Sequence, residues 1–215
     1  MSVTERLPLT RERIVAAAVV LADENGVDAL SMRKLGAALG VEAMSLYNHV
    51  ANKEDLLDAV LDAILLEMDL PDPDGPWDDQ LRAIAHAFRR VGHAHPRIFP
   101  LFGSRSIRSV DGFRPLEQSY AAIRKAGLPP DEAFDAFGSL AAYVFGYVLT
   151  ELGGVVDLAE GRSIDFAALA AADHPWLVEM GTGLAQRDGD RQFAFGLELN
   201  LRGLADIVSD ARDRA

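Results

Sequence analysis

The segment from Ser31 to Lys53 gathers side chains that can donate hydrogen bonds and carry positive charge. Arginine can bond to guanine O6 and N7, asparagine to adenine N6 and N7, and lysine to phosphate oxygens. Glu42 is the only carboxylate in the segment, so the local charge favours a polyanion. The residues that we predict to contact DNA are Arg33, Lys34, Ala43, Met44, Ser45, Tyr47, Asn48, His49 and Lys53.

The chemistry of these side chains divides them into two roles. Arg33, Ser45 and Asn48 suit base edges, and Met44 suits the methyl group of thymine. The remaining polar members suit phosphate groups, which fix the position of a protein on DNA without reading its sequence. They are Lys34, Tyr47, His49 and Lys53.

Two short helices joined at Gly40 would hold these side chains in a helix-turn-helix, with the second helix presenting the candidates from Ala43 to His49. Gly36 removes a side chain where the two helices must cross closely. Ser31 can cap the first helix and Asn52 the helix that follows, with Asp55 three residues on approximating a capping box. The apolar residues expected on the inner face are Leu35, Leu39, Val41 and Leu46.

The whole stretch of residues 10–70 resembles the DNA-binding half of the tetracycline-repressor (TetR) family. Met32 is a departure, because the family usually carries Ser or Thr there near the phosphates, and this puts one backbone contact in question. The most specific pieces are the helix stop at Gly26, the start at 31–35, the Leu-Gly-Val turn at 39–41, the exit Leu46-Tyr-x-His-Val50 and the step Asn52-Lys53.

The resemblance implies a homodimer that binds double-stranded operator DNA as an inverted repeat. It also implies a second domain that holds a small effector. We expect a repressor that a small apolar or amphipathic molecule releases from its operator. An activator of the same build, or a three-helix bundle without a role on DNA, are the alternatives.

Composition is compatible with this interpretation, although the net charge of −12 would by itself disfavour a nucleic-acid partner. Residues 1–55 hold six basic and eight acidic residues, so −10 of the charge falls on residues 56–215. The chain has no cysteine, which fits a reducing cytoplasm. The start lacks a signal-peptide core, and the apolar run Leu140–Leu149 is shorter than the roughly 20 residues of a membrane span. We therefore expect a cytoplasmic protein without a membrane partner.

Helical periodicity without strand alternation predicts an all-α fold. A first helix capped by Thr10 would brace the helix-turn-helix, and a helix at 53–70 would link it to the rest. The sequence PDPDGP then marks a boundary between a DNA-binding domain at 1–70 and a larger effector-binding and dimerisation domain at 71–215. Helices of the second domain are expected at 77–94, 97–103, 112–126, 131–152, 174–186 and 190–211, with 153–173 as a connection.

Small and bulky residues share the helices at 131–152 and 190–211, which suggests close pairing with copies of themselves. The resemblance implies a four-helix bundle across a twofold axis. A core within one chain is the alternative. The residues predicted for dimerisation are Gly138, Ala142, Gly146, Phe193, Leu197, Leu201 and Leu204.

The aromatic residues of the second domain are expected to fill its core and to line an effector cavity, with 96–108 as a movable wall. The residues that chelate magnesium–tetracycline in the family's namesake are not recognisable, because Leu101 or Phe102 stands where a ligating His is expected. Tetracycline is therefore not the expected effector. The candidate ligand-binding residues are Phe88, His95, Phe99, Phe102, Arg105, Tyr120, Tyr143, Tyr147, Glu151 and Trp176.

Neither a metal site nor a catalytic site is expected, and no cofactor is implied. His86 and His93 are a heptad apart, about 10 Å by helical rise, which is too far to share an ion. His95 precedes a proline and is expected to end a helix, where an imidazolium can meet exposed carbonyls. A helical enzyme or carrier remains the competing class, because residues 104–106 with His93 and Glu151 could form a polar pocket.

Overall fold

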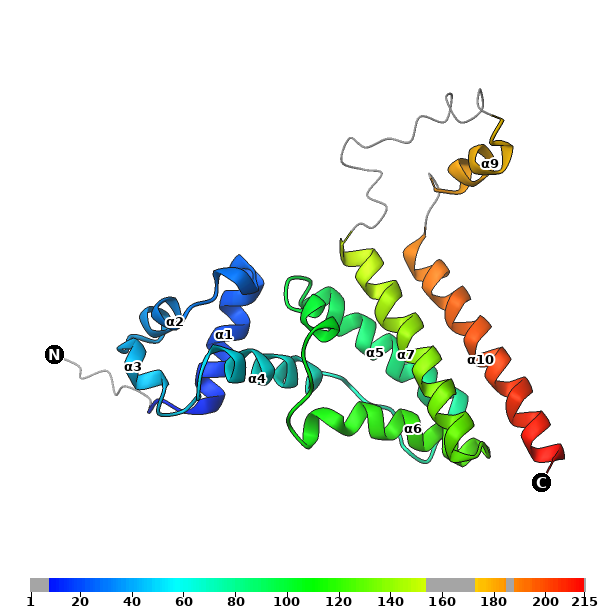
Figure 1. Ribbon diagram of the computed structural model, residues 1–215, viewed down its shortest axis with the longest axis horizontal. Helices are drawn as coiled ribbons and strands as arrows, with labels where there is room; N and C mark the ends of the chain where they lie inside the picture. Colours follow the sequence, from blue (N-terminus) through cyan, green and yellow to red (C-terminus); the bar gives the residue numbers. More distant parts are fainter. Residues whose placement is uncertain (1–7, 154–172, 185–187, 215) are drawn as a thin grey trace. The chain divides into compact units, whose positions relative to one another are not determined.

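The structure is a computed structural model that describes residues 8–153, 173–184 and 188–214 (Figure 1). Every regular element in these ranges is a helix, which confirms the predicted all-α fold. Backbone contacts divide the chain into two compact units, one ending at Ala122 and the other beginning at Ile123.

Four α-helices open the first unit, and the sequence correctly marks the starts of α1, α2 and α4 and the ends of α1 and α2. The side-chain oxygens of Thr10, Ser31 and Asn52 each accept a bond from the backbone N–H three residues on. Gly26 (φ 82°) and Gly40 (φ 69°) end the first two helices in conformations that other residues rarely adopt. The helices are α1 (Arg11–Asn25), α2 (Met32–Leu39), α3 (Ala43–Leu46) and α4 (Lys53–Leu65), with a 3-10 turn η1 (Val27–Ala29) after α1.

The apolar faces of these helices meet in one core. Full burial of a Leu or Ile side chain contributes about 1.5–3 kcal/mol to stability, so this core holds the four helices together. Leu39 and Val41 pack against its edge. The fully buried members include Ile14 and Ala18 of α1, Leu35 of α2, Leu46 of α3 and Val60, Leu61 and Ile64 of α4.

The sequence placed the end of α4 near residue 70, and this was wrong, because α4 ends at Leu65. The N–H groups of Glu67 and Met68 bond to carbonyls only three residues earlier, at 3.3 and 3.1 Å. Such bonds tighten the last turn and let the chain leave the helix axis. Met68 is thereby buried in the core. The two halves of the chain are therefore not joined by one continuous helix through residue 70.

Later segments of the first unit pack on α4. They are α5 (Trp77–Ala94), η2 (Phe99–Gly103) and η3 (Asp111–Phe113), and α6 (Arg114–Ala126) follows across the division between the units. The helix predicted at 97–103 is a 3-10 turn rather than an α-helix. Because these segments pack on α4, the compact unit extends well beyond residue 70. The domain boundary at that position stays a prediction.

Two long helices, α7 (Pro130–Gly153) and α10 (Gly189–Asp213), run antiparallel in the second unit (Figure 1). Tyr143 and Tyr147 of α7 donate hydroxyl bonds to the carbonyl oxygens of Phe193 (2.7 Å) and Gly189 (3.0 Å) of α10. Gly196 permits this approach, because a Cβ there would overlap the Tyr143 ring. A shorter helix, α9 (Pro175–Leu184), precedes α10, and most of the connection predicted at 153–173 lies outside the described residues.

Among the described helices, α7 is long and apolar enough to cross a membrane by length and composition alone. Only 22% of its most apolar window is buried within the chain. A helix that packs in a soluble core or against a second subunit has the same composition.

Candidate nucleic-acid interface

The helix-turn-helix is built on a close crossing of α2 and α3. A Cβ added to Gly36 would lie 2.9 Å from Val41 O and 3.2 Å from Ala43 N, both backbone atoms. The N–H of Val41 closes the turn by donating to Gly36 O at 2.9 Å. The predicted role of Gly36 is therefore confirmed by the geometry, since any side chain would push the two helices apart.

None of the nine residues predicted to contact DNA is buried. Met44 is 74% and Tyr47 43% exposed. Within the described ranges, the cationic groups of Arg33, Lys34 and Lys53 make no hydrogen bond or ion pair with the protein. Arg33, Lys34, Met44, Tyr47 and Asn48 are exposed, and Ala43, Ser45, His49 and Lys53 are half-buried. The structure thus leaves all nine accessible, and their contacts with DNA stay a prediction.

The second helix of this motif is shorter than the sequence suggested. It ends at Leu46, and Tyr47, Asn48 and His49 form turns after it. The N–H of Tyr47 bonds to Met44 O at 3.3 Å and that of Asn48 to Ser45 O at 3.4 Å, both long bonds. Met32 is buried in the core, so its side chain does not supply the phosphate contact that Ser or Thr makes in the family.

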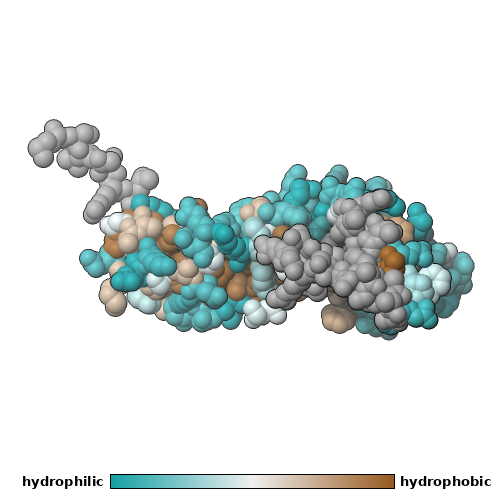
Figure 2. Space-filling view, turned by 90° about the horizontal axis from the view of Figure 1, so that it is seen from above, coloured by the Kyte–Doolittle hydropathy of each residue, from teal (hydrophilic) through white to brown (hydrophobic). Residues whose placement is uncertain are grey.

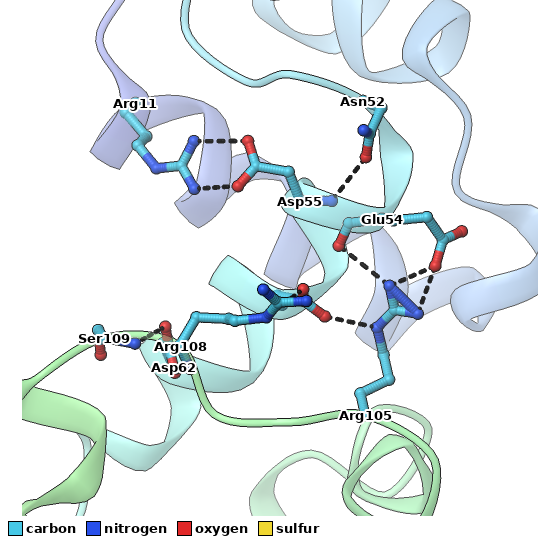
Figure 3. Close-up of polar contacts among 9 residues, drawn as sticks. Arg11, Asn52, Glu54, Asp55, Asp62, Arg105, Arg108 and Ser109 are labelled. Atoms are coloured by element: carbon cyan, nitrogen blue, oxygen red, sulfur yellow. Dashed lines mark hydrogen bonds and ion pairs between the residues drawn. The ribbon is translucent and has the colours of Figure 1, made fainter.

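Arg11 was not predicted from the sequence to contribute to this site. It holds the chain that follows the turn at residues 47–49, which we call the reading turn. Its guanidinium donates to His49 O at 3.0 Å. It also makes two bonds, of 2.9 and 2.7 Å, to the Asp55 carboxylate (Figure 3). Asp55 also accepts from the backbone N–H of Ala51 at 2.8 Å, whereas a capping box would have used the N–H of Asn52. The hydrogen bond from Arg11 lowers the pKa of Asp55 to about 2.

A second set of contacts to α4 comes from a clasp segment, which we define as residues 105–109. Arg105 donates to Asp58 Oδ1 at 2.9 Å, to the Glu54 carboxylate and to Glu54 O at 3.0 Å (Figure 3). The backbone N–H groups of Arg108 and Ser109 donate to the two oxygens of Asp62 at 3.2 and 2.8 Å. Because Glu54, Asp58 and Asp62 are four residues apart, one face of α4 carries a carboxylate on each successive turn.

These contacts change the interpretation of Arg105. It was predicted to bind ligand and to form part of a polar pocket, but its side chain is only 14% exposed and is committed to α4. The segment 96–108 was predicted as a movable wall of the cavity. The structure shows that its end is attached directly to the helix that follows the reading turn.

His95, another predicted ligand contact, is also engaged within the protein. It ends α5 as predicted, but its ring meets carboxylates rather than exposed carbonyls. Nδ1 lies 2.8 Å from Asp23 Oδ2 and Nε2 lies 2.9 Å from Glu67 Oε2. Arg97 donates to the carbonyls of Asp23 and Glu24 at 2.6 Å each, so the start of the following segment is fixed to the end of α1.

The aromatic candidates for an effector cavity fall into two groups. Phe88, Phe99 and Phe102 form one cluster in the first unit, with ring centroids 5.0 to 5.4 Å apart. Tyr143 and Tyr147 form another with Phe193 in the second unit. The remaining candidates are Tyr120 and Glu151, which are half-buried, and Trp176, which is exposed on α9.

The stripe predicted for dimerisation on α10 faces its own chain. Phe193, Leu197, Leu201 and Leu204 are at most 6% exposed, and α10 packs against α7. These four residues therefore contribute to a core within the chain, and their part in dimerisation stays a prediction. By contrast, Gly138, Ala142 and Gly146 are exposed on α7. The exposed apolar side chains of this helix pair are Phe134, Phe195, Leu199 and Ile207.

Two family models match the chain, and they leave few of its residues uncovered. One, described as "Bacterial regulatory proteins, tetR family", matches residues 14–60, and the other, "Tetracyclin repressor-like, C-terminal domain", matches residues 70–208. An HTH-type transcriptional regulator of Saccharopolyspora erythraea is 40% identical over 75% of this chain and 74% of its own length. The HTH-type transcriptional repressor DrrR1 of Streptomyces coeruleorubidus is 31% identical over 95% of this chain and 80% of its own.

Solved structures agree with these matches. ActR of Streptomyces coelicolor, in complex with actinorhodin, is 30% identical with a TM-score of 0.79 and covers 94% of this chain and 99% of its own. BioQ, solved with its natural double-stranded DNA operator, is 29% identical with a TM-score of 0.67 and covers 93% and 99%. The curated relatives are named as regulators and repressors, not as enzymes. The chain therefore belongs to the TetR family of bacterial transcriptional regulators.

Proposed function

We propose that this protein is a cytoplasmic repressor that binds an inverted-repeat operator as a homodimer and leaves it when a small molecule binds. The observation that carries the proposal is the close crossing of α2 and α3. The exposed polar residues there include cations that form no ion pair with any residue the structure describes. The relative DrrR1 is named a repressor, and BioQ was solved with its operator, which supports binding to DNA and repression.

The exposed apolar surface of α7 and α10 supports the homodimer. The face seen in Figure 2 is mostly hydrophilic, with small separate apolar patches. Phe134, Phe195 and Leu199 are each more than half exposed, which is costly unless a partner covers them. A second copy brings the same surface, and the resulting twofold axis would present two reading turns to an inverted repeat.

The clasp segment supports release by an effector. A ligand can change DNA affinity only if it favours one arrangement of the protein over another. Residues 105–109 are bonded to three successive turns of α4, so a ligand that displaces them alters the support of the reading turn. The sequence predicts a continuous helix at 53–70 as the link to the rest of the chain. Because α4 ends at Leu65, we assign the linking role to the clasp segment instead. ActR was solved with actinorhodin, which supports an apolar or amphipathic effector.

The experiment that tests DNA binding is selection from a random double-stranded DNA pool with the purified full-length protein. We expect an enriched inverted repeat. An Arg33→Ala, Asn48→Ala variant of equal thermal stability should fail to enrich it. Absence of any enriched sequence with the wild-type protein would contradict the proposal.

The effector is sought by thermal shift with small apolar compounds, followed by titration of each hit with and without operator. Linkage requires that operator DNA weaken effector binding by the same factor as effector weakens DNA binding, typically about 5- to 150-fold. A hit with equal affinity in both titrations is not an inducer. A hit that is consumed with turnover would favour the competing class, a helical enzyme. A reporter fused to the selected operator distinguishes repression from activation.

A further inference from the structure

The turn that carries Tyr47, Asn48 and His49 has little structure of its own. α3 contains four residues, and a helix this short is not stable in isolation. The backbone N–H groups of Tyr47 and Asn48 make long bonds of 3.3 and 3.4 Å, whereas those of His49 and Val50 bond to Leu46 O at 2.9 and 3.0 Å. The conformation at Tyr47 and Asn48 therefore depends in part on how the chain after them is held.

Arg11 provides that hold. It reaches from the first residue of α1 to His49 O and to Asp55, which are 38 and 44 residues away in the sequence. Asp55 in turn accepts the N–H of Ala51, so one guanidinium and one carboxylate fix both ends of residues 49–55. A planar fork bound to both oxygens of a carboxylate restricts direction as well as distance.

We propose that Arg11 is a positioning residue for DNA recognition, one that keeps the reading turn in a single conformation without itself touching DNA. Both terminal nitrogens of its guanidinium are occupied by the protein. The pair is partly exposed, at 41% and 32% of the side chains, and such pairs add little to global stability. Ile14 and Ala18, fully buried on α1, hold the helix in place independently. The inference rests on the proposed DNA binding.

The first measurement needs no DNA. Arg11→Lys keeps the charge but removes the fork, so amide hydrogen exchange should accelerate at residues 47–52 while the core amides of α1 and α4 keep their protection. Arg13→Lys is the matched control, because Arg13 lies on the same helix and its guanidinium donates to Pro8 O at 3.3 Å. Unchanged exchange at 47–52, or equal acceleration in the control, would overturn the proposal.

The second measurement is operator affinity per folded protein at several salt concentrations. Arg11→Lys should bind on the order of 10-fold more weakly, the effect of a charged hydrogen bond, with the same salt slope as wild type. The two roles are separated by Arg11→Met, which also removes the charge: a salt slope lowered by about one in this variant would make Arg11 a direct phosphate contact. Unchanged affinity in Arg11→Lys would also refute the role. Asp55→Asn, alone and combined with Arg11→Lys, should show that the two losses are not additive.

These outcomes are separable from failure of DNA binding itself. A wild-type protein that selects no operator refutes the proposed function. A wild-type protein that binds while Arg11→Lys binds equally well refutes only the role of Arg11. Arg11→Lys could also melt at a temperature so low that unfolding explains the whole loss of operator binding. In that case Arg11 has a purely structural role, and the proposal is refuted.

Discussion

At the scale of single residues, His95 occupies a site that only its protonated form satisfies. Both ring nitrogens face carboxylate oxygens, and only an imidazolium can donate from both. Burial lowers the pKa of His95, but the bonds to Glu67 and Asp23 outweigh it and raise the pKa above its ordinary value. The other oxygen of Asp23 is buried without a hydrogen-bond partner among the described residues, so His95 is the side chain that supports this carboxylate.

We therefore predict that the bonds of His95 stabilise the fold fully below the ordinary histidine pKa of about 6.5. Their contribution to the free energy of unfolding is lost as the pH rises through the higher pKa of His95 in the folded protein. The charged groups that face the ring are Asp23 of α1, Glu67 after α4 and, beside it, Arg97. Urea unfolding of wild type and His95→Gln between about pH 6 and 9 tests this. The difference between the two proteins should shrink with rising pH, and a constant difference would contradict the assignment.

Gly36 gives a second prediction at this scale. Gly36→Ala places a methyl group against backbone atoms of the turn, which cannot move aside cheaply. We expect a loss of about 1–3 kcal/mol, the usual cost of overpacking, together with loss of operator binding. Ala38→Ser is the control, because it also adds one atom but at an exposed position of α2. Equal melting temperatures for the two variants would show that α2 and α3 are not in close contact.

Base reading is a third prediction. Asn48 is exposed beside the short helix, where it can bond to an adenine edge. Asn48→Ala should relax preference at one position of each half-site at a cost of about 1–3 kcal/mol. Lys53→Ala should instead weaken all sequences alike and lower the salt slope by about one. Unchanged preference in Asn48→Ala would mean that another element enters the groove.

At the scale of elements, the clasp segment depends on Arg105 rather than on Arg108. Arg105 is largely buried against Glu54 and Asp58, whereas the Arg108 side chain is 72% exposed and meets Asp58 at 3.2 Å. Arg105→Met should therefore cost about 1–3 kcal/mol, because it leaves the buried Asp58 with a single partner. Arg108→Met should cost about 1 kcal/mol or less. Urea unfolding compares the two, and similar losses would show that the segment is held by its backbone bonds to Asp62.

The elements also show what the sequence could predict. Helix starts at Thr10, Ser31 and Asn52 and stops at Gly26 and Gly40 were found because caps and glycine turns act on residues a few positions away. The end of α3 was misplaced because nothing in the sequence stops a helix at residue 47. The end of α4 was misplaced because a late 3-10 turn has no marker of its own.

Long-range pairs were beyond such reasoning. His95 lies 72 residues from Asp23, and Arg105 lies 47 residues from Asp58, so no local pattern joins them. Both side chains were instead predicted to bind ligand. An apolar stripe likewise indicates that a helix face is buried, but not whether α7 of the same chain or a second copy covers it. The structure shows Phe193 and Leu197 buried within the chain, which the sequence could not decide.

At the scale of the whole molecule, dimerisation is the main expectation. Gly146→Phe should force apart helices that meet at α7, and Leu199→Arg should place a charge in the same apolar surface. Light scattering should show monomers with loss of operator binding. Val110→Arg is the control, because Val110 is 88% exposed in the other unit. Intact dimers in both test variants would place the interface elsewhere.

The carboxylates on one face of α4, those of Glu54, Asp58 and Asp62, also affect the electrostatic potential of the protein. Arg105 and Arg108 of the clasp segment pair with Glu54 and Asp58, and Glu54 directly follows Lys53, which is predicted to hold a phosphate. Withdrawing that segment would uncover negative charge on the helix that begins at Lys53, so release from the operator would be driven by repulsion as well as by movement. Salt screens such repulsion over about 10 Å at 0.1 M, and the power of an inducer should therefore decline as ionic strength rises.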